Sequence, residues 1–130
     1  KIIYNFENPA RGDVIVFKPP FSESTYFIKR IIGLPGETIH VDSNRVIIQN
    51  KDNPKGFVLD QPYASSIRDS VTNIVLKNDE YFVMGDNRSV SSDSRVWGPL
   101  TKDRISGRAD LRLFPLRTIG IMPGAIETQK

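Results

Sequence analysis

The chain has 130 residues, of which 38% are hydrophobic and 25% are charged, and its formal net charge is +3. This length and composition are typical of one globular domain with a core of its own. The absence of cysteine excludes disulfides and thiolate chemistry, and the mild, interspersed charge does not indicate a polyanionic partner. No run approaches the ~20 apolar residues of a membrane span, and no signal peptide opens the chain.

Short runs rich in aromatic and β-branched residues recur along the chain, separated by turn-forming residues. They predict strands over residues 1–6, 14–17, 26–32, 38–41, 46–49, 57–59, 71–76, 81–84 and 108–114. The fourth and fifth of these are expected to pair as a hairpin. One helical turn is expected at 101–104, with Thr101 as its N-cap. This pattern indicates an all-β, barrel-like domain with at most one short helical turn.

Two adjacent cations, Lys29 and Arg30, interrupt the apolar strand over residues 26–32. Side chains alternate between the faces of a strand, so Lys29 shares a face with Phe27 and Ile31, and one cation is expected to lie against an apolar layer. Desolvation can lower the pKa of a lysine from its usual ~10.4, which would make Lys29 a usable general base. The alternative is an ammonium that reaches water over a buried stem, as strand lysines commonly do.

A polar loop over residues 85–95 directly follows the strand 81–84. Its eleven residues include two acids, two arginines and four serines, which is more than a solvated turn requires. Asp86 is a candidate partner for Arg30; such a pair at the surface contributes only about 0–1 kcal/mol, so its value would be geometric. On residue chemistry alone Ser91 is a candidate nucleophile, because it is the polar residue expected to meet Lys29.

Other kinds of site find little support in the residues. The chain has one histidine, His40, which is expected at a strand end on the surface. A metal site built on one histidine is not expected, and a Ser-His-Asp triad would need His40, near which no nucleophile motif occurs. No basic cluster with stacking aromatics indicates a nucleic-acid binder.

Three segments, in this order, closely resemble signature boxes of the type I signal peptidases. They are RGDVIVF at 11–17, FIKRIIGLPGE at 27–37, and GDNR at 85–88 followed by Ser91, Asp93, Ser94, Arg95 and Gly98. This family consists of membrane-anchored Ser/Lys endopeptidases that remove signal peptides from exported proteins. The resemblance implies one β-rich peptidase domain over residues 1–115 and an irregular tail over 116–130. It also implies no cofactor, and a small insert at about 50–71, as in compact forms from Gram-positive and related bacteria.

The resemblance implies roles for single residues. Lys29 stands where the family keeps its general base, and Ser91 where a serine hydroxyl orients that lysine. Supporting positions are matched by Arg30, Gly85, Asp86, Asp93 and Arg95. Pockets for small substrate side chains are matched by Val16, Phe27 and Ile28, although many members have tyrosine in place of Phe27.

The nucleophile box of the family, Ser-Met-x-Pro-Ser/Thr, does not occur in the chain, and Met122-Pro123 lacks the serine. The chain also begins within what reads as a strand. We therefore expect the nucleophile, its oxyanion hole and a membrane anchor to precede Lys1, and the 130 residues alone to be inactive. The implied partners are secretory preproteins cut after small residues, at the extracytoplasmic side of the cell membrane.

Two alternatives remain open at this point. A non-catalytic β-module, or pseudoenzyme, could retain the boxes for folding only. A self-cleaving repressor-type Ser/Lys peptidase shares the lysine on a strand, but it would lack the loop over residues 85–95.

Overall fold

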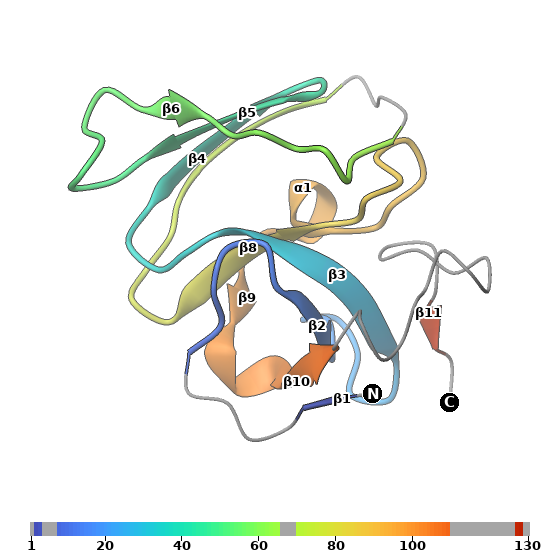
Figure 1. The fold of residues 1–130 in the computed structure, drawn as a ribbon. Helices are drawn as coiled ribbons and strands as arrows, with labels where there is room; N and C mark the ends of the chain where they lie inside the picture. Colours follow the sequence, from blue (N-terminus) through green and yellow to red (C-terminus); the bar gives the residue numbers. More distant parts are fainter. Residues whose placement is uncertain (1, 4–7, 66–69, 110–126, 129–130) are drawn as a thin grey trace.

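The computed structural model describes residues 2–3, 8–65, 70–109 and 127–128, with side chains over 8–65 and 70–109. Its larger sheet has seven strands (Figure 1), and six of them follow one another in a continuous order. These six are β1 (Ile2–Ile3), β10 (Ile105–Ala109), β2 (Val14–Phe17), β3 (Tyr26–Gly33), β8 (Glu80–Met84) and β9 (Leu100–Thr101). The seventh, β11 (Glu127–Thr128), pairs with β3.

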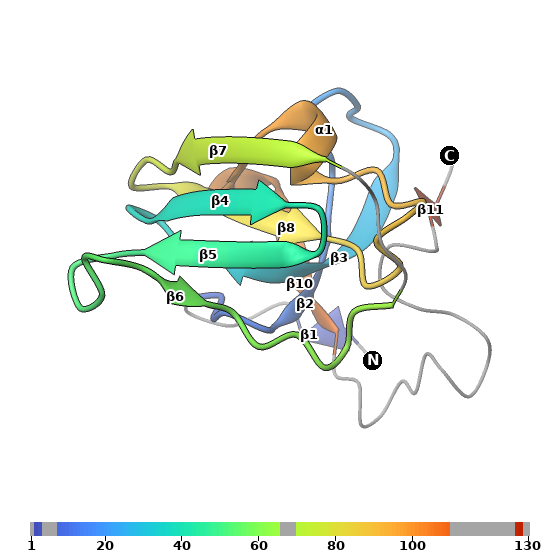
Figure 2. The ribbon, with the colours of Figure 1, turned by 90° about the horizontal axis from the view of Figure 1, so that it is seen from above.

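The smaller sheet has four strands and lies over the larger one, as Figure 2 shows. In spatial order its strands are β6 (Phe57–Val58), β5 (Arg45–Gln49), β4 (Thr38–Asp42) and β7 (Val71–Val75). Neighbouring strands in both sheets are antiparallel. The predicted mostly-β class is therefore confirmed. None of the helices among the described residues is long and apolar enough to cross a membrane.

The predicted hairpin is confirmed, with β4 and β5 in register from Thr38↔Gln49 to Asp42↔Arg45. Ser43 opens its two-residue turn with a φ of 55°. The position predicted for His40 is wrong: it lies half-buried at the centre of β4, not at a strand end. The reason is that pairing with β5 and with β7 continues to Asp42, so His40 has Ile47 and Asn73 as cross-strand neighbours on its two sides.

Two short helical elements are present in the described ranges. The predicted turn is confirmed as the 3₁₀ helix η1 (Lys102–Arg104), although the hydroxyl of its N-cap residue Thr101 bonds Asp103 and makes no cap bond. The second, α1 (Ser94–Trp97), was not expected at the end of the polar loop. It forms because the Asp93 carboxylate accepts a hydrogen bond from the backbone N–H of Arg95, as an N-cap does.

The ends of the chain are described only in part. Of the strand predicted over 1–6, Ile2–Ile3 is described, and of the strand predicted over 108–114, residues 110–114 lie outside the described residues. In the tail predicted to be irregular, Glu127–Thr128 form β11, and the other residues lie outside the described ranges. The domain bounds at 1–115 and 116–130 therefore stay predictions.

β3 and β8 lie between two hydrophobic cores, because the side chains of each strand alternate between faces. One core fills the space between the two sheets and includes Ile32, Phe82 and Met84 from the larger sheet. The other lies on the opposite face of the larger sheet and includes Ile31 and Val83. Figure 1 shows β2, β9 and β10 curling below β3 and β8, and the second core also includes Ile15 of β2 and Leu100 of β9. β3 is therefore buried on both sides.

Gly33, at the end of β3, allows the two sheets to pack closely. A Cβ built at this position would lie 2.6 Å from Cδ1 of Ile39 and 3.0 Å from Cδ1 of Leu76, which are closer than van der Waals contact. The pairing of β3 with β8 shifts register between Ile31 and Gly33. The turn that follows is therefore held close beneath the smaller sheet.

A buried carboxylate, Glu37, fastens that turn to the start of β2. Its two oxygens accept bonds from the Arg11 guanidinium at 2.6 and 2.8 Å, and further bonds from the Asn50 side chain and the Leu34 backbone N–H. Burial by itself raises the pKa of Glu37, but these hydrogen bonds, led by that of Arg11, outweigh it and hold the pKa below its usual range. The folded chain therefore stabilises the ionised form.

Glu37→Gln should lower the free energy of unfolding at pH 7 by about 1–3 kcal/mol, because it leaves buried donors poorly satisfied. The folded pKa lies below the unfolded value of about 4.3. The contribution of the carboxylate is therefore complete above the unfolded pKa and is lost as pH falls through the folded pKa. Urea titrations of both proteins at several pH values between 7 and 3 should show the difference shrinking below about pH 5. A difference that stays constant down to pH 3 would contradict this account.

Candidate active site

Lys29 lies on the inner face of β3, within the core formed by the curled part of the larger sheet. It is 0% exposed, and its cross-strand neighbour on β2 is Ile15, which is equally buried. Phe27 and Ile31, two residues away on either side, belong to the same core. The prediction that one cation of the pair lies against an apolar layer is therefore confirmed, and the alternative of an ammonium that reaches water is wrong for Lys29.

The Lys29 side chain meets Ser91, which comes from the polar loop 62 positions further along the chain. Lys29 Nζ donates a hydrogen bond to Ser91 Oγ at 3.1 Å, and Ser91 is also 0% exposed. The nitrogen lies 5.0 Å from the centre of the Phe27 ring. The predicted convergence of Lys29 and Ser91 within hydrogen-bond distance is confirmed. A buried amine and a buried hydroxyl in contact are a pair that can exchange or direct a proton.

Asp93 holds the loop that carries Ser91 in shape. One carboxylate oxygen accepts from the Gly85 backbone N–H at 3.0 Å, and the two oxygens accept from the Arg95 guanidinium at 2.9 and 2.7 Å. The side chains of both Asp93 and Arg95 are fully buried. Desolvation raises the pKa of Asp93, but the hydrogen bonds and charge of Arg95 outweigh it, so the pKa lies below its usual range. Asp93 and Arg95, which both match supporting positions of the family, are therefore paired with each other.

Arg30 lies on the other face of β3 and binds the beginning of the same loop. Its Nε and Nη2 donate to the two oxygens of Asp86 at 3.0 and 2.8 Å, and its Nη1 donates to the backbone carbonyl of Gly12 at 2.9 Å. Asp86 is buried, and the Arg30 side chain is 13% exposed. The predicted Arg30–Asp86 pair is confirmed, although it is a buried bidentate pair and not the exposed pair expected from the sequence.

Two residues near the site were not predicted from the sequence. Arg88 is 1% exposed, and its Nε donates to the backbone carbonyl of Gly85 at 2.8 Å. It belongs to one of the recognised boxes, so that segment could have indicated it. Tyr63 places its ring 4.2 Å from the guanidinium carbon of Arg30 and 6.0 Å from that of Arg88. No pattern in a single sequence indicates that contact, because it joins separate segments.

The residues expected to line substrate pockets lie on two faces of the larger sheet. Val16 and Ile28 are cross-strand neighbours and therefore share one face. Phe27 lies opposite Phe17 on the face of Lys29, and their rings meet edge to face with centroids 6.1 Å apart. Val16 and Phe27 are buried, and Ile28 is half-buried. Their part in substrate binding stays a prediction.

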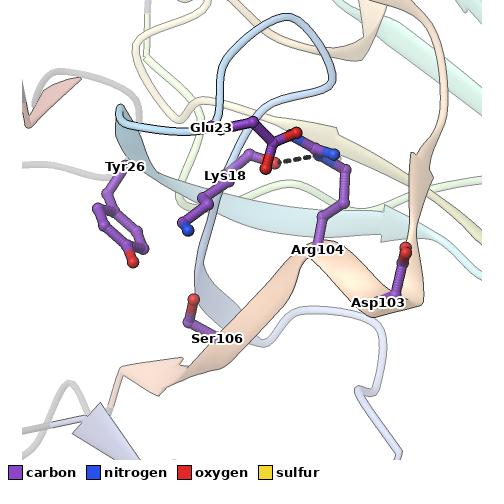
Figure 3. Close-up of a pocket in the computed structure, with 6 residues that line it drawn as sticks. All are labelled: Lys18, Glu23, Tyr26, Asp103, Arg104 and Ser106. Atoms are coloured by element: carbon purple, nitrogen blue, oxygen red, sulfur yellow. Dashed lines mark hydrogen bonds and ion pairs between the residues drawn. The ribbon is translucent and has the colours of Figure 1, made fainter.

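A polar pocket of about 260 Å³ lies where β2, β3 and β10 meet η1 (Figure 3). It is lined by Lys18, Glu23, Tyr26, Asp103, Arg104 and Ser106. The Arg104 guanidinium donates to the backbone carbonyls of Lys18, Pro19 and Ser22, and to the carboxylate of Glu23. The arginine in this pocket therefore holds the loop that joins β2 to β3. Within the described ranges, no three histidine, cysteine or acidic side chains gather as metal ligands would.

The fold and the three boxes define a β-rich domain of a peptidase family. The family model described as signal peptidase, peptidase S26, matches residues 1–114. This chain belongs to that family. Signal peptidase I of Leptolyngbya laminosa is 38% identical over 127 residues, which cover 92% of this chain and 60% of that protein. The probable signal peptidase I-2 of a Synechocystis strain is 34% identical and covers 99% of this chain and 59% of that protein.

A solved structure gives the same assignment. The crystal structure of a signal peptidase I from Enterococcus faecalis V583 superposes with a TM-score of 0.66 at 27% identity, covering 82% of this chain and all of that one. The chain spans about 60% of the length of the curated relatives that it matches first. The fold and the family are therefore shown for this chain, which corresponds to only part of each relative.

Asp93→Ala should destabilise the chain by about 3–5 kcal/mol, because it leaves the buried Arg95 guanidinium without its counter-ion. It also removes the N-cap of α1 and the acceptor for Gly85, so Ser91 should lose its fixed distance from Lys29. Urea denaturation measures the first effect. Glu23→Ala is the matched control: it breaks an Asp/Glu–Arg pair in which the acid is 81% exposed, and it should cost less than about 1 kcal/mol. Equal losses in the two variants would show that the Asp93 pair does not support the loop.

Proposed function

We propose that the protein to which this segment belongs is a signal peptidase in which Lys29 is the general base of a Ser/Lys dyad. The observation that carries the proposal is the hydrogen bond between Lys29 and Ser91, both fully buried, in a chain of the signal peptidase family. Removal from water disfavours an ammonium ion and favours the neutral amine that a base must be. The contact with the Phe27 ring acts in the opposite direction, since an aromatic face attracts a cation.

Ser91 has an orienting role in this proposal. A neutral lysine amine has two N–H groups and one lone pair. If one N–H is donated to Ser91, as the geometry allows, the rotation of the amine is restricted and its lone pair has a preferred direction. The nucleophile is then a different serine, outside these 130 residues, because the family's Ser-Met-x-Pro box does not occur in them.

The reaction follows the course of acyl transfer. The nucleophilic hydroxyl gives its proton to Lys29 as its oxygen bonds the carbonyl carbon of the small residue that precedes the cleaved peptide bond. Lys29 then gives that proton to the departing amine as the carbon–nitrogen bond breaks, leaving an acyl-enzyme. Water attacks the acyl-enzyme with Lys29 again as base, and the serine is released. No step in this scheme needs a cofactor.

The substrate would bind as an added strand on β3. Beside Arg30, Ile31 and Gly33 the edge of β3 that faces away from β2 is taken by β8, but beside Tyr26 and Phe27 β3 pairs with β11. At Tyr26 and Phe27, β3 therefore pairs with an extended segment along this edge. An edge of this kind is what the addition of a substrate strand requires. We propose that preproteins bind the same edge, with small side chains near Val16, Phe27 and Ile28. Cleavage would take place at the extracytoplasmic side of the cell membrane. A membrane anchor would hold the enzyme there.

The test compares four proteins on one secretory preprotein: the 130-residue chain, its full-length parent, and the parent with Lys29→Ala or with Lys77→Ala. Lys77 is an exposed lysine between β7 and β8, so it controls for loss of charge. We expect cleavage by the parent and by Lys77→Ala only, with a rate that rises with pH as the base loses its proton.

The other outcomes of this assay are informative. Cleavage by the 130-residue chain would mean that the nucleophile lies inside it, with Ser91 the first residue to replace. A folded parent that cuts no preprotein would favour the pseudoenzyme, in which the boxes serve folding only. Full activity in Lys29→Ala would exclude Lys29 as the base.

A second prediction follows from the shared edge of β3. If β11 and the substrate compete for it, weakening β11 should lower KM and leave kcat nearly unchanged. Replacing Glu127 and Thr128 together by proline removes both backbone N–H groups, one of which must face β3 because N–H directions alternate along a strand. The matched control replaces both by alanine, which keeps the backbone donors. Equal KM values in the two variants would contradict competition at this edge.

A further inference from the structure

Resting on the proposed function, we propose that Tyr63 is a positioning residue that sets the distance between Lys29 and Ser91. Tyr63 lies in the segment between β6 and β7 and packs, half-buried, against the core between the two sheets. Its ring lies against Arg30, whereas the Lys29–Ser91 pair lies on the other face of β3. Its effect on the reaction would therefore pass through the two arginines beside its ring.

Each of these two arginines lies close in sequence to one member of the Lys29–Ser91 pair. Arg30 follows Lys29 on β3 and is bound at two points to Asp86. Arg88 lies three residues before Ser91 and is bound to the carbonyl of Gly85. One aromatic ring thus contacts a cation on the strand that carries the base and a cation on the loop that carries its partner. Cation–π contacts at partly desolvated sites contribute about 0.5–2 kcal/mol.

The backbone around Tyr63 is fastened to the same loop. The Ser65 backbone N–H donates to the carbonyl of Asp86 at 2.8 Å, and the Arg88 N–H donates to the carbonyl of Ser65 at 2.9 Å. Two residues before Tyr63, the Gln61 side chain accepts a hydrogen bond from the Arg88 guanidinium. Residues 61–65, with Tyr63 at their centre, are therefore bound to residues 86–88. We call residues 61–65 the clamp.

The ring, and not the hydroxyl, is expected to act. Burial raises the pKa of the Tyr63 phenol, so the side chain is neutral over the range in which a peptidase works. Burial lowers the pKa of the Arg88 guanidinium and the charge of Arg95 lowers it further, whereas the carboxylates of Asp86 and Asp93 favour the charged form. A phenylalanine ring offers the same face to both cations, whereas an aliphatic side chain fills the space without it.

The chain provides a matched control in Phe57. It is also partly buried, packs against the same core, and places its ring 5.7 Å from an arginine, Arg11, which is itself ion-paired with Glu37. That ion pair fastens the turn after β3 and lies outside the dyad and its loop. Leucine at either position should therefore produce a similar loss of packing, but only Tyr63→Leu should affect the reaction.

The experiment uses the full-length parent with Tyr63→Leu, Tyr63→Phe or Phe57→Leu and a preprotein substrate. We expect Tyr63→Leu to lower kcat roughly 10- to 100-fold with KM changed less than about 3-fold, since misplacement by about 1 Å is costly for catalysis. Tyr63→Phe should recover kcat to within about 3-fold of the parent, and Phe57→Leu should leave kcat unchanged. If Tyr63→Leu behaves as Phe57→Leu does, or if phenylalanine does not rescue, the proposal is overturned.

Amide hydrogen exchange on the same proteins tests the clamp without any activity. Tyr63→Leu should increase exchange at the amides of Gly85 and Arg88 at least about 10-fold, while Phe57→Leu leaves them protected. Unchanged exchange in Tyr63→Leu would overturn the positioning role, whatever the enzyme cuts. If the parent cuts no preprotein and exchange still rises, the proposed function fails and the clamp stands.

Discussion

The structure depends on one constraint: β3 is buried on both faces and yet carries two adjacent cations. Neighbouring residues of a strand point to opposite faces, so one partner cannot serve both Lys29 and Arg30. A single loop resolves this by supplying Asp86 to Arg30 at its beginning and Ser91 to Lys29 near its end. The loop must therefore pass around the end of β8 and reach both faces of β3.

Holding that loop in one conformation requires the burial of charged side chains, which is energetically unfavourable. A fully buried ion pair such as Asp93–Arg95 loses the hydration of both charges, and hydrophobic residues of the same volume are often as stabilising. The pair instead fixes the conformation of the loop. Asp93 binds the N–H of Gly85 at one end of the loop and caps α1 at the other, which places Ser91 between two fixed points. The charges on this loop thus serve geometry more than stability.

The two faces of β3 carry different parts of the candidate site. The inner face holds the amine and hydroxyl pair within an apolar core. The outer face holds the Arg30–Asp86 pair, with the Tyr63 ring against the guanidinium. The Arg30–Asp86 pair fixes the strand and the loop relative to each other. Near Tyr26 the same strand still has an edge that pairs with another segment, β11.

Local residue patterns determined much of this protein. Short runs of aromatic and β-branched residues predicted β2, β3, β8 and the hairpin. The alternation of side chains along a strand predicted that one of the two adjacent cations lies in an apolar layer. Both are properties of neighbours along the chain. The boxes indicated the family, and the polar loop indicated partners for Lys29 and Arg30. Tertiary structure alone decided that the Arg30–Asp86 pair is buried, that Val16 and Phe27 face opposite ways, and that Tyr63 contacts two arginines. Those properties depend on which segments, distant in sequence, pack together, and a single sequence does not encode such contacts in any local pattern.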